Sequence, residues 1–285
     1  MALRLREIAL RLDEGEDSLP HKIATILEFD VQNIKIWKIV RKGIDARRKP
    51  DVLRVYTVEF SCFDESDILQ KINHIDTLVE VVGAPSFQSY SLKLQPKVLV
   101  VGMGPAGLFS ALSLVEAGAQ VCLIERGRPV AERLQDVNNF WSGGKFDPES
   151  NIQFGEGGAG TFSDGKLTSR LNHPAMSYVL ERLVEFGAPK EILWQAKPHI
   201  GSDRLRSVLI QFRERLLSLG VEIKFSSCLT GIETKNGCIS AGIINDRESI
   251  ECDQLVLALG HSARDTYQLL AEKKVRLEQK PFAVG

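Results

Sequence analysis

The residues with the clearest chemical use form a glycine fingerprint at positions 102–107, Gly-Met-Gly-Pro-Ala-Gly. Its three glycines allow a tight turn, a close approach of backbone to a pyrophosphate, and close packing of a helix on a strand. An apolar run, 98–101, precedes the fingerprint and a helical pattern follows it, as a dinucleotide site requires. A helix that begins here presents unpaired N–H groups and a partial positive charge to phosphate. We predict that the cofactor-binding residues of this segment are Gly102, Gly104, Pro105, Ala106 and Gly107.

An acidic residue follows the next apolar run. Glu125 comes directly after residues 121–124 and lies 23 residues beyond Gly102. A carboxylate at this place accepts hydrogen bonds from a ribose hydroxyl, and its charge disfavours a 2′-phosphate, which argues against NADP at this position. We predict that Glu125 and the adjacent Arg126 contact the cofactor. The alternative is a β-α-β unit that packs in a sheet and binds no ligand.

A second glycine-rich segment, 155–161, reads Gly-Glu-Gly-Gly-Ala-Gly-Thr. Four glycines in six residues expose backbone N–H groups, which suits an anion nest or a stretch of chain lying along a cofactor. The flanking Phe154 and Phe162 are apolar, unlike the flanks of a linker. The predicted cofactor-binding residues here are Gly157, Gly158, Gly160 and Thr161, and the alternative is a flexible surface loop.

A third segment, 255–260, is an apolar strand pattern that ends in glycine. Such a strand can return the chain to the crevice at the carboxyl ends of a parallel sheet, where ligands bind. We therefore predict a cofactor contact at Gly260. His261 follows Gly260. Either a role in the site or a structural hydrogen bond would account for this histidine.

The sequence predicts two structural units, and the three glycine-rich segments lie in the second. Residues 1–93 suggest a small α+β unit with strands over 5–12, 34–40 and 55–62, a helix after Ser18, another helix over 64–80, and a linker over 82–95. From residue 97 the pattern is α/β, with strands over 98–101, 121–124, 221–225, 228–230, 239–244 and 255–259, and helices over 108–117, 177–186 and 204–219.

Composition narrows the class of protein. The 285 residues include 36 Lys+Arg and 37 Asp+Glu, so the net charge of −1 gives no global attraction to nucleic acid or to an anionic membrane. Neither a membrane-spanning run nor a signal peptide is evident, and the five cysteines form no CxxC pair, so we expect a cytoplasmic protein without disulfides. A basic stretch, 41–49, suits a solvated hairpin, and contact with RNA is the alternative.

The three glycine-rich segments, in this order, resemble the FAD-dependent oxidoreductases of the two-dinucleotide-fold type, and in particular the uncharacterised FAD-dependent dehydrogenases of bacteria. The resemblance rests on residues 41–47, 104–111, 147–167, 197–201, 260–266 and 280–282. It implies a Rossmann-like, glutathione-reductase-type FAD domain over 94–285 with an inserted substrate region at about 170–255. The α+β domain over 1–93 precedes it, with a ferredoxin-like arrangement as one candidate.

The same resemblance implies roles for the predicted residues. The ADP half of FAD would be held at Gly102, Gly104, Gly107 and Glu125, and the backbone of Leu229 would face the adenine. Gly157, Gly158 and Gly160 would lie near the pyrophosphate or the flavin ring, and Gly260 would approach from a strand end. NAD(P)H is a candidate electron donor, whereas the substrate, the catalytic residues and the oligomeric state stay open.

Relatives of this type continue well past the point where this sequence stops. Only 25 residues follow Gly260, and residues 282–285 are apolar. We therefore expect a C-terminally truncated chain that binds FAD weakly or not at all, with binding restored in a longer chain. The alternative functions are a flavoprotein that acts on RNA and a non-catalytic nucleotide-binding protein.

Overall fold

Two compact units make up the chain, each formed by two separate stretches of sequence. The computed structural model describes residues 3–63, 68, 77–80, 90–163, 165–167, 173 and 175–281. The first unit combines Met1–Phe87 with Lys166–Ile200, and the second combines Gln88–Gly165 with Gly201–Gly285. The predicted boundary at residue 93 lies near the break at Phe87, whereas the predicted insertion at 170–255 is shared between the units. The boundaries of independently folding domains stay a prediction.

The first unit is built on an antiparallel sheet with the strand order β2-β3-β1-β4. The strands are β1 (Leu3–Arg11), β2 (Ile34–Asp45), β3 (Leu53–Cys62) and β4 (Leu78–Glu80). Helix α1 (Leu19–Ile26) and the short helical turns η1 (Glu16–Ser18) and η2 (Val31–Asn33) connect β1 to β2, and β3 lies between these two strands. This is the split β-α-β arrangement of ferredoxin-like folds.

Alternating side chains explain how this sheet covers its core. Tyr56, Val58 and Phe60 on β3 point to the same face and are buried.

The predicted helix over 64–80 is wrong at its end, because residues 78–80 form β4 and pair with β1. Most of its remaining residues, and most of the predicted linker, lie outside the described residues. Ser18 precedes α1 as predicted, but its hydroxyl donates to the carbonyl of Gly15 (2.6 Å) rather than accepting from a helical N–H. The unit also contains α5 (Ala175–Glu185) and η4 (Lys190–Leu193).

The second unit is a Rossmann-like α/β fold. Its parallel sheet has the order β11-β5-β6-β7, formed by Gln254–Leu257, Lys97–Val101, Gln120–Ile124 and Glu222–Lys224. Helix α3 (Pro105–Glu116) connects β5 to β6, which confirms the predicted β-α-β unit. Strand β5 is apolar throughout its length after Lys97 and is buried, as expected for a central strand of a parallel sheet.

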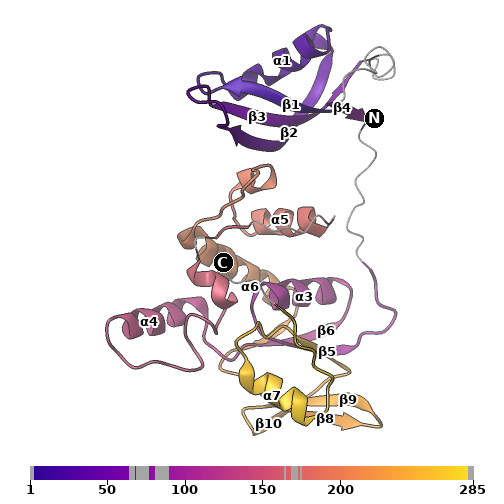
Figure 1. The fold of residues 1–285 in the computed structure, drawn as a ribbon. Helices are drawn as coiled ribbons and strands as arrows, with labels where there is room; N and C mark the ends of the chain where they lie inside the picture. Colours follow the sequence, from indigo (N-terminus) through magenta and orange to yellow (C-terminus); the bar gives the residue numbers. More distant parts are fainter. Residues whose placement is uncertain are drawn as a thin grey trace. The chain divides into compact units, whose positions relative to one another are not determined.

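A small antiparallel sheet and further helices also belong to the described part of this unit (Figure 1). The sheet has the order β10-β9-β8, formed by Glu248–Glu251, Cys238–Ile244 and Leu229–Lys235, and its side chains share a core with β5 and β6. The helices are α4 (Val130–Trp141), α6 (Ser202–Ser218) and α7 (Arg264–Glu272), and a short turn, η3 (Gly158–Phe162), lies in the second glycine-rich segment. Among the described helices, none combines the length and apolarity needed to cross a membrane.

Helix α4 was not predicted from the sequence, for a reason that bears on the site. Its buried residues are Val130, Arg133 and Val137, so a charged residue occupies the middle of the stripe that an apolar pattern would mark. Helix α7 and strand β10 were also missed. Each is short, and α7 buries only Thr266 and Leu270.

Candidate cofactor-binding site

The first glycine segment forms the turn between β5 and α3. Gly102 has φ +101°, and a Cβ there would lie 2.4 Å from the carbonyl oxygen of Ala258. A Cβ on Gly107 would lie 1.8 Å from the carbonyl oxygen of Gly102. At Gly104, the residue before the helix, a Cβ would instead meet its nearest neighbour, the Cα of Gly158, at 3.9 Å. The turn thus requires glycine at 102 and 107, whereas Gly104 keeps one side of the backbone open.

That open side faces a cavity of about 160 Å³ at the carboxyl ends of β5 and β11. Glycine backbone and the start of α3 form much of its wall. Its lining residues are Gly102, Gly104, Pro105, Ala106, Glu125, Gln153, Phe154, Gly158, Ala159, Ala258, Leu259, Gly260, His261 and Ser262. Seven of the predicted site residues, drawn from all three glycine-rich segments and Glu125, therefore meet at one cavity.

A smaller cavity adjoins the first and shares part of its lining. Both include Gly102, Glu125 and Phe154, while the smaller one adds Arg126 and the predicted Leu229 at the start of β8. Glu125 thus lies where the two cavities meet, a position that suits the ribose of an adenosine between its base and its phosphates.

The Glu125 carboxylate also joins the two glycine segments, a role that sequence reasoning missed. Its Oε2 accepts from the Met103 N–H (2.8 Å), and its Oε1 accepts from the N–H groups of Gly127 and Gly155 (2.9 Å each). The residue is only 5% exposed. A buried carboxylate that accepts three backbone N–H groups stabilises the turn around it.

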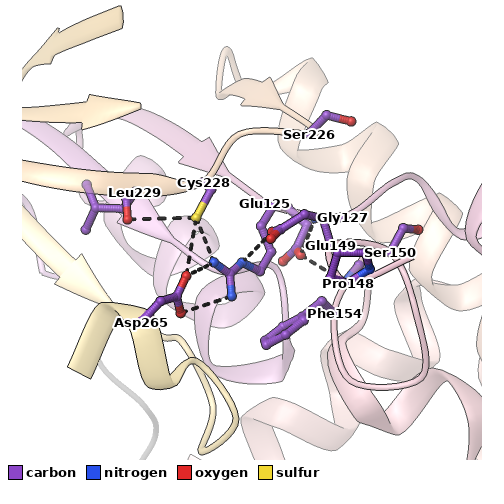
Figure 2. Close-up of polar contacts among 12 residues, drawn as sticks. Glu125, Gly127, Pro148, Glu149, Ser150, Phe154, Ser226, Cys228, Leu229 and Asp265 are labelled. Atoms are coloured by element: carbon purple, nitrogen blue, oxygen red, sulfur yellow. Dashed lines mark hydrogen bonds and ion pairs between the residues drawn. The ribbon is translucent and has the colours of Figure 1, made fainter. Parts of the chain in front are cut away.

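Arg126 makes polar contacts with three side chains that Figure 2 labels, those of Glu149, Cys228 and Asp265. Its Nε pairs with Glu149 (3.0 Å), and its Nη2 lies 2.7 Å from the Cys228 sulfur and pairs with Asp265. The guanidinium also lies over the Phe154 ring, 4.5 Å from its centroid. Burial lowers the pKa of Arg126, but the hydrogen bonds to Asp265 and Cys228 outweigh it and raise the pKa overall. The cation at the smaller cavity is therefore charged and fixed from several sides.

The second glycine segment lies against the first. The Gly157 N–H donates to the carbonyl of Met103 (2.8 Å), and Gly158 lies beside Gly104. The predicted Gly157, Gly160 and Thr161 are not among the residues that line the two cavities described above. Thr161 is buried, and its hydroxyl donates to the carbonyl of Glu156 (2.8 Å) and accepts from Arg133 (3.0 Å).

Three further residues at the site were missed from the sequence. Arg133 contacts the glycine segment from α4, and the Ser262 hydroxyl donates to the Gln153 side chain (3.1 Å) at the wall of the larger cavity. Their signal is weak because none belongs to a glycine motif.

His261 is exposed and lies 3.4 Å from the Ser262 hydroxyl, and the Gly260 carbonyl accepts from Tyr267 (2.9 Å).

Comparison with known proteins indicates which cofactor suits this fold. Residues 95–134 match the family model of an FAD binding domain, and residues 2–61 match a domain of unknown function, DUF8436. An uncharacterised protein of Clostridium beijerinckii is 40% identical over 286 residues, which cover 100% of this chain and 54% of the relative. The chain thus spans about half the length of that curated relative. A thiamine thiazole synthase of Aeropyrum pernix is 24% identical over 216 residues, 71% of this chain and 68% of the relative.

Solved structures give weaker likenesses. THI4 of Thermovibrio ammonificans has a TM-score of 0.41 and 17% identity, with 64% of each chain covered. CtdE in complex with FAD has a TM-score of 0.35 and 20% identity, with 61% of this chain and 41% of that one covered.

The fold and the site thus define a dinucleotide-binding protein of the Rossmann-like class. The family match over 95–134 includes β5, α3, β6 and Glu125. Residues 95–134 resemble an FAD binding domain, and FAD is the cofactor that this match supports for the dinucleotide-binding fold.

Proposed function

We propose that this chain is the FAD-binding part of an oxidoreductase and that the ADP half of FAD lies at Gly102–Gly107 and Glu125. The observation that carries the proposal is the cavity at the start of α3, walled by glycine backbone from both glycine segments. The first turn of α3 supplies main-chain N–H groups that an α-helix leaves unpaired, and Pro105 at its first position has no N–H to lose. A pyrophosphate suits such a place.

The remaining acceptor capacity of Glu125 supports the ribose contact. A carboxylate offers about four lone-pair sites, and three of them accept backbone N–H groups here. Within the described part of the chain, Oε2 accepts from Met103 alone, which leaves one of its acceptor sites for a ligand. A ribose hydroxyl would fill it, and the adenine would lie at the smaller cavity beside Arg126 and Leu229. Bound FAD would supply the electron-transfer chemistry, with NAD(P)H as a candidate donor.

An absorbance spectrum between 300 and 550 nm tests the proposal directly. We expect added FAD to show a shifted, structured flavin band and quenched fluorescence when the chain is present at high concentration, because weak binding also produces these changes once the site is saturated. Anaerobic addition of NADH then separates an oxidoreductase from a non-catalytic binder, since bleaching of the flavin band requires electron transfer. Unchanged FAD spectra at a saturating concentration of the chain would contradict the proposed site.

Replacement of Gly104 by alanine should separate cofactor binding from folding. The added methyl meets its nearest atom at an ordinary contact distance of 3.9 Å, so we expect an unchanged urea midpoint. The methyl occupies the open side of the turn, so FAD affinity should fall by about tenfold or more, which is about 1.4 kcal/mol. Fluorescence titration measures the affinity. Equal affinities of Gly104→Ala and the unaltered chain would place the pyrophosphate elsewhere.

A further inference from the structure

The buried arginine of α4 makes an unusual set of contacts with the second glycine segment. Arg133 is fully buried and donates five hydrogen bonds. Among the described residues, its acceptors are the Thr161 hydroxyl and four main-chain carbonyls, those of Asn151 (2.8 Å), Ile152 (2.9 Å), Glu156 (2.7 Å) and Gly158 (2.9 Å). One side chain thus gathers the carbonyl groups of a segment that has few side chains of its own.

Burial of this cation is costly, and the hydrogen bonds offset that cost. Desolvation lowers the pKa of Arg133 to about 10, although the negative charges of Glu125 and Glu156 oppose the change. Glu156 is fully buried too, and its Oε2 accepts from the Val130 N–H and from Arg213 on α6 (2.7 Å each). The glycine segment is therefore held by charged side chains of two helices, α4 and α6.

The direction of the captured carbonyls fixes the direction of the neighbouring N–H groups. A trans peptide is planar, so its carbonyl and its N–H point in opposite directions. The Glu156 carbonyl faces Arg133, and the N–H of the same peptide, that of Gly157, donates to Met103 on the other side (2.8 Å). By the same geometry the Gly158 carbonyl faces Arg133, so the N–H of Ala159 points away from it. Ala159 lines the larger cavity.

We infer that Arg133 is a positioning residue, which holds segment 155–162 against the first glycine turn and directs the Ala159 N–H toward the cavity. Gly155 fits this arrangement, because a Cβ there would lie 2.3 Å from the Arg133 Cδ. The placement of segment 155–162 follows from these contacts alone. The effect of Arg133 on FAD affinity rests on the proposed function.

Hydrogen–deuterium exchange combined with FAD titration tests this inference on the full chain. In Arg133→Lys a single ammonium replaces the planar five-donor fork, so it cannot meet the same acceptors. We expect exchange of the amides of 155–162 to rise at least tenfold, and FAD to bind at least tenfold more weakly. Arg128→Lys is the control, because Arg128 is exposed and its side chain pairs only with Asp136 among the described residues. Unchanged exchange of 155–162 in Arg133→Lys would overturn the inference, and so would faster exchange with unaltered FAD affinity.

A milder pair of variants covers the case in which Arg133→Lys fails to fold. Thr161→Val removes one acceptor of Arg133 and one donor to the Glu156 carbonyl, whereas Thr161→Ser keeps the hydroxyl. We expect a severalfold rise in exchange of 155–162 for the valine variant and recovery in the serine variant. Equal exchange in both variants would overturn the inference. Absence of FAD binding by the unaltered chain would contradict the proposed function alone, because the exchange comparison needs no cofactor.

Discussion

Replacement of Gly107 by alanine should destabilise the second unit more than any other single-methyl addition in the first glycine turn. The new Cβ would lie 1.8 Å from the carbonyl oxygen of Gly102 and 3.0 Å from its carbonyl carbon. Both obstacles are backbone, so no side chain can rotate away, and α3 must shift relative to β5. Overpacking a core costs about 1–3 kcal/mol, and we expect the upper end of that range or beyond. Such a loss is a large fraction of a typical domain stability of about 5–15 kcal/mol.

Urea unfolding followed by far-UV circular dichroism measures this effect. Gly160→Ala is the matched control, since a Cβ there meets nothing within 4 Å and its backbone does not adopt a positive φ. We expect a near-native midpoint for Gly160→Ala and a much lower one for Gly107→Ala. Equal midpoints would show that α3 and β5 are not packed as closely as described.

The first glycine turn could be predicted because all of its signals are local. The strand, the three glycines, the helix and Glu125 lie within one stretch of about 30 residues, the size of a β-α-β unit. Each required residue type follows from a steric or electrostatic need of that unit, as the close approaches at Gly102 and Gly107 show. Sequence reasoning therefore identified both the fold class and the main wall of the cavity.

Arg133 could not be predicted because its partners carry no sequence signal. Four of its acceptors are main-chain carbonyls, which every residue possesses. Its burial also interrupts the apolar stripe that would have revealed α4. For the same reason the sequence could not show that the Thr161 hydroxyl bonds to Arg133 and Glu156, and its assignment as a cofactor contact stays a prediction. The glycine pattern located the segment, but the direction of each peptide depends on an arginine about 25 residues earlier in the chain.

Removal of the Glu125 carboxylate should produce the second large effect, on stability and on cofactor binding together. Glu125→Ala leaves the N–H groups of Met103, Gly127 and Gly155 without their acceptor in a buried place. Each unsatisfied buried group costs about 1–3 kcal/mol, so we expect a loss of about 3 kcal/mol or more in urea unfolding. Glu149→Gln is the control: Glu149 is half exposed and pairs with Arg126, so its loss should cost about 1 kcal/mol or less.

Glu125→Gln separates the two roles of this residue. The amide oxygen can still accept from Gly127 and Gly155, while the new NH₂ group faces the Met103 N–H and any ribose hydroxyl that donates to Oε2. We therefore expect a smaller loss of stability than in Glu125→Ala, together with a loss of FAD affinity nearly as large. The affinity is measured as the stabilisation that saturating FAD gives to each variant. If Glu125→Gln kept the affinity of the unaltered chain, Glu125 would serve only to join the two glycine segments, and the ribose would require another acceptor.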